Sequence, residues 1–290
     1  MELFAESLLN GILIGGILIT MAVGFSLSFG VMEIIDFAVG EWLMFASFVT
    51  YSMIQFSKIE PLLLVPVIAI VFFFAGFSIQ PLIARAIKGK QSLAVLMGLV
   101  FTFGISLTLR GSALSIWGFN VKSISSVVSG NHLAVGSFVI PATRLVAFSF
   151  GIFSTLALMI FMRFTKTGMA IRATAQNEQV AKTMGINVTK IRSLVYGIYA
   201  AMTGMAGVFI GIMFSISAEM GVLYTIFIFF VVVLAGMGYI QGVIYSALFL
   251  GVLQSLITIY IGAQYVLILV FASLYVVLLI APKGLLGKGA

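Results

Sequence analysis

Three acidic residues stand close together between two apolar runs, in the segment GVMEIIDFAVGEWLM at residues 30–44. A carboxylate at the centre of a bilayer costs about 2.5 to 3.5 kcal/mol, so Glu33, Asp36 and Glu41 should face protein, water or the membrane surface. One interpretation is an ion or proton relay in contact with substrate or a coupling ion. The other is structural: Asp36 caps the following helix, Glu41 favours the positive end of its dipole, and Gly40 allows close helix packing.

A second segment with unusual backbone chemistry is GMGYIQG, which contains Gly236, Gly238 and Gly242. These glycines predict a break between two apolar helices. Non-helical backbone at membrane depth is tolerated where it is buried in protein or lines a cavity, and paired breaks often flank a transport pathway. We therefore predict that the acid-containing segment and this glycine segment border a translocation pathway.

The longest polar interruption of the chain covers residues 163–192 and holds six of its fifteen basic residues but only one acid, Glu178. Its spacing predicts a turn at 166–168, a helix from Met169 to about Met184, and a helix end at Gly185. The small or apolar residues on this helix are Ala170, Ala173, Ala181 and Met184, and the polar ones are Arg172, Gln176, Asn177 and Lys182. Such a helix suits docking into a groove on another protein. A surface connection carrying ordinary cytoplasmic charge is the alternative.

The elements that position these residues are membrane-spanning helices, because 62% of the chain is hydrophobic, 8% is charged and the mean hydropathy is +1.26. A crossing needs roughly 20 apolar residues. The sequence therefore predicts an all-α polytopic inner-membrane bundle of about eight or nine transmembrane helices with broken segments, in a single domain over 1–290. The absence of cysteine excludes disulfides and thiolate metal sites, and His132 has no second ligand nearby, so no metal site is expected.

The apolar segments occupy approximately residues 7–31, 37–56, 61–83, 92–117, 143–162, 193–217, 222–238, 243–261 and 265–281. Cytoplasmic loops collect Lys and Arg, so the polar interruption and the C-terminus should be cytoplasmic, together with Arg85, Lys88, Lys90, Lys283 and Lys288. The connection at about 118–143 and the turns near Glu60 and Glu219 then lie outside, with the N-terminus. Since this bias accounts for the basic residues, no nucleic-acid partner is expected.

Several stretches resemble the permease family of branched-chain amino acid ABC transporters. The loop and following span, TKTGMAIRATAQNEQVAKTMGINVTKIRSLVYGIYAAMTGMAGVFIG, are similar to the family's pattern T-x-x-G-x-A-x-R-A-x-x-x-N/D-x-x-x-A-x-x-x-G-I-N. DFAVGEWLM resembles its N-F-A-H-G-E motif, and VVLAGMGYIQGVIYSALFLGVLQSL with APKGLLGK resembles its closing segment and terminus. The resemblance covers nearly the whole chain.

This resemblance implies a permease subunit of a binding-protein-dependent importer, with a second permease, two ATPase subunits and an extracytoplasmic binding protein as partners. It makes the loop about 163–192 an ATPase-coupling segment, with Gly168, Arg172, Ala173, Gln176, Asn177, Ala181, Met184 and Gly185 as coupling residues. The chain has no G-x-x-x-x-G-K-[ST] motif, so ATP and magnesium are expected on the partner subunits, and the chain itself is not expected to be an enzyme.

Departures from the family pattern leave the substrate open. Asp36 stands where the family has Asn, Val39 where it has His, and Arg110 where an uncharged polar residue is common. Branched-chain amino acids are the leading substrate prediction. An importer of urea, short amides or another small metabolite is the alternative within the family, and an ion-coupled secondary transporter or channel is the alternative of a different class.

Overall fold

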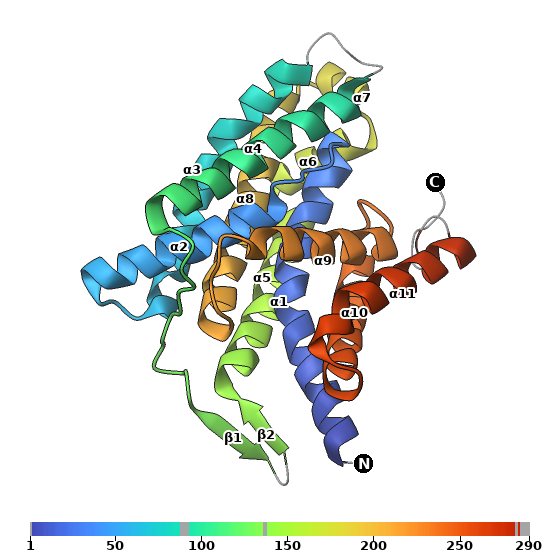
Figure 1. Cartoon of the computed structure of the whole chain (residues 1–290). Helices are drawn as coiled ribbons and strands as arrows, with labels where there is room; N and C mark the ends of the chain where they lie inside the picture. The colour runs from blue at the N-terminus through green and yellow to red at the C-terminus, as the bar shows by residue number, and fades with distance from the viewer. Residues whose placement is uncertain (1, 88–92, 136–137, 282–283, 285–290) are drawn as a thin grey trace.

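The computed structural model describes residues 2–87, 93–135, 138–281 and 284 of the chain, which are predominantly helical (Figure 1). The long apolar elements are α1 (Glu2–Met32), α2 (Val39–Ser57), α3 (Pro61–Ile87), α4 (Ala94–Trp117), α5 (Ala142–Phe164), α8 (Val188–Met213), α9 (Met220–Ala235), α10 (Ile240–Tyr260) and α11 (Val266–Ile280). Every apolar segment expected from the sequence therefore forms a helix. The polar interruption contains α6 (Lys166–Gln176) and α7 (Glu178–Thr183), and a 3-10 turn, η2 (Ala263–Tyr265), precedes α11.

Helices α1 and α8 form the centre of the bundle. In their most apolar windows 83% and 78% of residues are buried, against 17% in α4 and 11% in α11. Helices α2, α3 and α9 pack against this centre, and α5 and α10 pack on α1 (Figure 1). The remaining apolar surface of the outer helices is available to lipid or to other subunits.

Within the described residues, seven helices are long and apolar enough to cross a membrane. They are α1, α3, α4, α5, α8, α10 and α11, the last with its preceding 3-10 turn. The other two apolar helices, α2 and α9, pack against each other and run across the upright helices in Figure 1. The chain is thus a polytopic helical membrane bundle in which α2 and α9 cross the other long helices.

Close helix packing depends on glycine at two crossings of α1. A Cβ atom on Gly251 of α10 would lie 2.3 Å from the backbone oxygen of Gly11, and one on Gly151 of α5 would lie 2.1 Å from that of Gly16. Both oxygens belong to backbone that cannot move aside without separating the helices. Small residues at these positions therefore set how closely α5 and α10 approach the central helix.

The two ends of the molecule differ. A hairpin of β1 (His132–Val135) and β2 (Phe138–Pro141) lies at the same end as the N-terminus, and α6 and α7 lie at the opposite end, which also holds the end of α3 (Figure 1). This agrees with the opposite sides predicted for 118–143 and 163–192, although the hairpin itself was not predicted.

His132 is exposed, as expected, but lies in a strand paired with Pro141. Lys88, Lys90, Lys283 and Lys288 lie outside the described residues.

The loops predicted to share the N-terminal side contact one another. Lys122 and Ile216 exchange backbone hydrogen bonds of 2.9 and 2.8 Å, and the Glu60 carboxylate accepts the Val127 N–H at 3.1 Å. Arg110, near the end of α4, forms an ion pair with Glu219 in the connection between α8 and α9. The turn near Glu219 was predicted to lie on the same side as residues 118–143, and this ion pair brings the Arg110 side chain to that surface.

Candidate functional site

The acidic segment forms the break between α1 and α2, but its three carboxylates do not gather in one cluster. Glu33 ends α1 with a left-handed backbone (φ +54°) and is exposed, whereas Asp36 and Glu41 are each only 2% exposed. No group of three or more His, Cys, Asp or Glu residues able to hold a metal ion occurs in the described part of the chain. The structure therefore provides two buried acids in this segment, held in different ways.

Asp36 stabilises the turn that leads into α2. One carboxylate oxygen accepts the Ala38 N–H at 2.8 Å, and the other accepts the Tyr196 hydroxyl of α8 at 2.7 Å. The expected helix cap is wrong in detail, because Ala38 occupies the N-cap position and Asp36 forms a turn two residues earlier. Tyr196 packs edge-on against Tyr199, with ring centroids 5.2 Å apart. The carboxylate thus connects the helix break to the central helix α8.

Gly40 lies where α2 crosses α9. A Cβ atom on Gly40 would lie 1.8 Å from the backbone oxygen of Gly221, and the Gly40 N–H donates to the Thr225 hydroxyl at 3.0 Å. The predicted close approach of a helix to Gly40 is confirmed, with α9 as that helix. Glu41 follows in the first turn of α2 against Gly221, and its Oε2 atom has no hydrogen-bond partner among the described residues.

The predicted break at residues 236–242 is also present. Gly236 and Gly238 have φ angles of +90° and +85°, which only glycine adopts without strain, and they separate α9 from α10. Gly242 is buried in the first turn of α10, where a Cβ atom would lie 2.9 Å from the Ala235 oxygen. A Cβ atom on Gly30 would lie 3.4 Å from the Gly238 Cα, so this break touches the end of α1. The two predicted breaks are therefore neighbours in space.

The polar interruption contains two helices rather than the one that was predicted. Asn177 has an extended backbone (φ −158°), and its side chain accepts the Val180 N–H at 3.0 Å, so it ends α6 and caps α7. An asparagine in mid-helix can make this competing bond, which is why a continuous helix was the wrong expectation. Gly185 ends α7 as predicted: its φ is +79°, and the Gly185 and Ile186 N–H groups bond to the Lys182 and Ala181 oxygens.

The predicted coupling residues divide into buried and exposed sets. Gly168 and Ala181 are buried, and a Cβ on Gly168 would lie 2.5 Å from the Phe161 oxygen. These two residues hold the segment against its own chain. Ala173 is half-buried, and the exposed residues are Arg172, Gln176, Asn177, Met184 and Gly185. We call these five the α6–α7 surface. Met184 is 78% exposed, which makes it an apolar contact residue within a polar surface.

Charge pairs fix this segment to the bundle. The Glu178 carboxylate accepts from Lys182 at 2.7 Å and from Arg192 of α8 at 2.6 Å. Partial burial raises the pKa of Glu178, but the bond from Lys182 and the charge of Arg192 outweigh it and hold that pKa below its usual range. Helix α6 also packs against α1, α5 and α8. A displacement of the α6–α7 surface would therefore reach the central helices directly.

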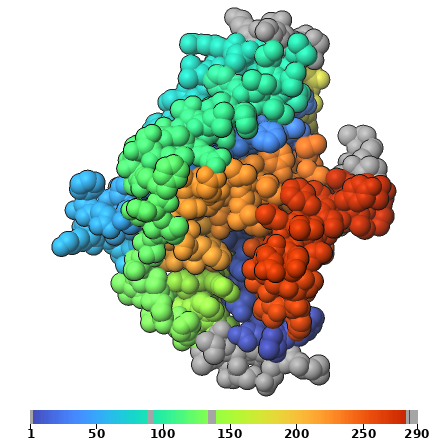
Figure 2. Space-filling view, viewed as in Figure 1, coloured from blue at the N-terminus to red at the C-terminus, as the bar shows by residue number. Residues whose placement is uncertain are grey.

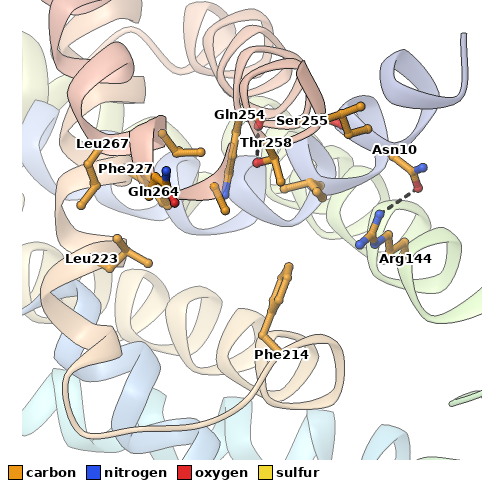
Figure 3. A pocket seen from close by; sticks show the side chains of 14 residues that line it. Asn10, Arg144, Phe214, Leu223, Phe227, Gln254, Ser255, Thr258, Gln264 and Leu267 are labelled. Atoms are coloured by element: carbon orange, nitrogen blue, oxygen red, sulfur yellow. Dashed lines mark hydrogen bonds between the residues drawn. The ribbon is translucent and has the colours of Figure 1, made fainter. Parts of the chain in front are cut away.

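A cavity of about 540 Å³ is lined by residues of α1, α5, α9, α10, η2 and α11 and lies toward the hairpin end. Figure 2 shows blue atoms of α1 at the bottom of a hollow flanked by orange and red segments. Its polar lining residues are Asn10, Arg144, Gln254, Ser255, Thr258 and Gln264, and its apolar ones include Ile14, Phe214, Leu223, Phe227 and Leu267 (Figure 3). None of these was predicted as a site residue. The sequence alone could have indicated Arg144 as a site residue. It is a basic residue at the start of the span 143–162, and that end of the span was predicted to lie on the external side, where basic residues are less common.

Comparisons with known proteins agree with the architecture. Residues 7–278 match the family described as branched-chain amino acid transport system / permease component. The permease protein LivH of a high-affinity branched-chain amino acid transport system in Escherichia coli K12 is 30% identical, covering 98% of this chain and 96% of its own. BraD of Pseudomonas aeruginosa is 28% identical, and a probable LivH of Methanocaldococcus jannaschii is 27% identical, each over at least 98% of this chain. No solved structure matches.

Proposed function

The chain belongs to the family of branched-chain amino acid transport permease components, and from this we propose that it is the membrane subunit of an ATP-driven importer of branched-chain amino acids. The importer would contain a second permease subunit, identical or homologous, and two ATPase subunits. An extracytoplasmic binding protein would deliver the substrate. ATP and Mg²⁺ would bind to the ATPases, so this chain would be a transport subunit and not an enzyme.

The observation that carries this proposal is the α6–α7 surface together with its place in the fold. Five exposed residues, including Arg172 and the apolar Met184, lie at the end opposite the hairpin on a segment that contacts α1 and α8. An ATPase docked there would act on the centre of the bundle through direct packing. This end would then be cytoplasmic, with the C-terminus, and the hairpin end would receive the binding protein.

The helix breaks suit a subunit that changes conformation. The Gly236–Gly238 turn rests on Gly30, and the turn before α2 is held by two hydrogen bonds to Asp36. We propose that the non-helical backbone on either side of the α2–α9 crossing lets these two helices change orientation while the long helices stay intact, once the Asp36 bonds are released. Closure of the ATPases would bias the bundle between outward- and inward-facing states through the coupling segment.

The test is uptake of radiolabelled leucine by vesicles that contain the complete transporter, with its binding protein outside and ATP on the ATPase side. The proposal requires accumulation that depends on both ATP and the binding protein. Accumulation driven by a proton gradient without ATP would instead establish an ion-coupled transporter and overturn the proposal.

A further inference from the structure

The cavity at the hairpin end has a polar side and an apolar side. Figure 3 shows Asn10 and Arg144 together on one side with Ser255 nearby, and Leu223 and Phe227 across the space. Its volume of about 540 Å³ lies within the roughly 300 to 1,000 Å³ of small-molecule sites. A molecule with one charged end and one aliphatic end would match both sides.

Arg144 supplies the charge of this cavity and has capacity to bind an anion. Its Nη1 donates to the Asn10 side-chain oxygen at 2.8 Å, which orients the guanidinium. No carboxylate of the described residues lies within salt-bridge distance of it. Because a guanidinium carries five N–H donors and binds a carboxylate through two parallel bonds, most of its donors are available to a ligand.

The position of Arg144 is unfavourable without an anion. It is the third residue of α5, where the helix dipole is positive and repels a cation. It also lies at the end of the molecule where the positive-inside bias disfavours basic residues, if that end is external as proposed. A bound carboxylate would remove the first cost, since it would be attracted by the guanidinium and by the helix end together.

From these observations we infer that the cavity is a substrate site of the transport pathway, in which Arg144 binds the carboxylate of an aliphatic zwitterionic amino acid. This inference rests on the proposed function and names its substrate class. Ser255 and Gln254 are the polar lining residues offered for the ammonium group, which must lie beside the carboxylate, and Phe214, Leu223 and Phe227 would contact the side chain. Urea and short amides lack the carboxylate, so they could accept a hydrogen bond from Arg144 but not the paired, charge-assisted bonds.

The chain contains no cysteine, so a single introduced thiol can report on the cavity. Thr258→Cys places a thiol in the lining. Ser115→Cys is the matched control, because Ser115 is exposed on α4, away from the cavity lining, and both hydroxyls bond only to the carbonyl four residues earlier. The rate of alkylation is measured on the full transporter in membranes without ATP, with leucine, leucinamide or urea added.

Leucine should slow alkylation of Thr258→Cys but not of Ser115→Cys, and leucinamide and urea should protect far more weakly than leucine. Adding Arg144→Gln should raise the leucine concentration needed for protection about tenfold or more, the loss expected for a charge-assisted hydrogen bond. Arg144→Lys, which keeps the charge, should retain part of the protection. Co-purification with the partner subunits checks that each variant folds.

The inference is overturned if leucine gives no protection, if leucinamide protects equally well, or if Arg144→Gln leaves protection unchanged. These readouts need no ATP, whereas the proposed importer is tested by ATP-dependent uptake. An importer that takes up leucine but shows no protection at Thr258→Cys would therefore retain the proposed function and reject only this site.

Discussion

Replacing Gly40 by alanine should destabilise the protein, because α2 and α9 cross at this residue without space for a methyl group. The added Cβ would lie 1.8 Å from the Gly221 oxygen and 2.5 Å from the Thr225 hydroxyl oxygen. The first of these atoms belongs to the backbone of α9 and cannot rotate away. The helices would have to separate, which would also lengthen the 3.0 Å hydrogen bond from the Gly40 N–H to Thr225.

The expected loss is the sum of two effects. Overpacking a well-packed core costs about 1 to 3 kcal/mol, and an interhelical hydrogen bond in a membrane protein contributes about 0.6 kcal/mol. Gly40→Ala should therefore reduce the free energy of unfolding by roughly 1.6 to 3.6 kcal/mol. The control is Gly104→Ala on α4, where a Cβ meets nothing within 4 Å. There alanine should be neutral or stabilising by up to about 1 kcal/mol, because it favours helix.

Tryptophan fluorescence during thermal unfolding of the detergent-purified chain measures this difference. Both tryptophans report on α2, since Trp42 is part of it and Trp117 stacks on Phe48 with ring centroids 5.0 Å apart. Gly40→Ala should unfold at a clearly lower temperature than the wild type, and Gly104→Ala should not. Equal midpoints for Gly40→Ala and the wild type would show that the α2–α9 crossing is looser than described and would refute the reasoning.

Four further predictions concern single side chains. Tyr196→Phe should destabilise by about 1 to 3 kcal/mol, because it leaves a buried Asp36 oxygen without its donor, whereas the exposed Tyr245→Phe should be neutral in the same melting assay. Asp36→Asn keeps the acceptor for the Ala38 N–H, so leucine uptake should persist at normal membrane levels. Arg172→Glu reverses a charge on the α6–α7 surface and should lower ATPase co-purification and ATP-dependent uptake. Glu178→Gln should reduce the pH dependence of the unfolding temperature below about pH 5.

The sign of the last prediction follows from the lowered pKa of Glu178. A carboxylate whose pKa is lower in the folded state stabilises the fold above its unfolded pKa of about 4.3 and loses this contribution as the pH falls through the folded value. The wild type should therefore lose more stability on acidification than the glutamine variant, and equal losses would contradict the ion pairs. For the α6–α7 surface, unchanged ATPase binding and uptake in Arg172→Glu would reject the proposed contact with the ATPase. Loss of uptake in Asp36→Asn at normal membrane levels would reject a purely structural role for Asp36.

Much of the fold follows from the sequence, because long apolar runs and glycine-rich interruptions act locally. The nine apolar segments form helices, the break at Gly236–Gly238 is present, and Gly185 ends α7 with the expected left-handed backbone. Each of these depends on hydropathy or on a conformation that glycine allows within a few residues. Gly40 was predicted to allow close packing for the same local reason, although the sequence did not identify α9 as its partner.

The parts that the sequence did not predict depend on bonds that compete with a regular pattern or join distant segments. The Asn177 side chain divides α6 from α7 by capping, although the surrounding spacing is helical. The bond between Asp36 and Tyr196 joins residues 160 positions apart, and that between Arg144 and Asn10 joins residues 134 positions apart. Periodicity in one segment contains no information about such partners. The sequence shows a base at position 144 but neither its bond to Asn10 nor the cavity around it.

Helix α1 offers a physical route between the two ends of the molecule. It contributes Asn10 and Ile14 to the cavity, contacts the α9–α10 break through Gly30, and packs against α6. Its 31 residues form one helix about 46 Å long at 1.5 Å per residue, with glycine contacts to α5 and α10 that resist sliding. A push on α6 would then reach Asn10, which accepts a hydrogen bond from Arg144, through a single helix. Coupling and substrate contact would then depend on the position of one helix.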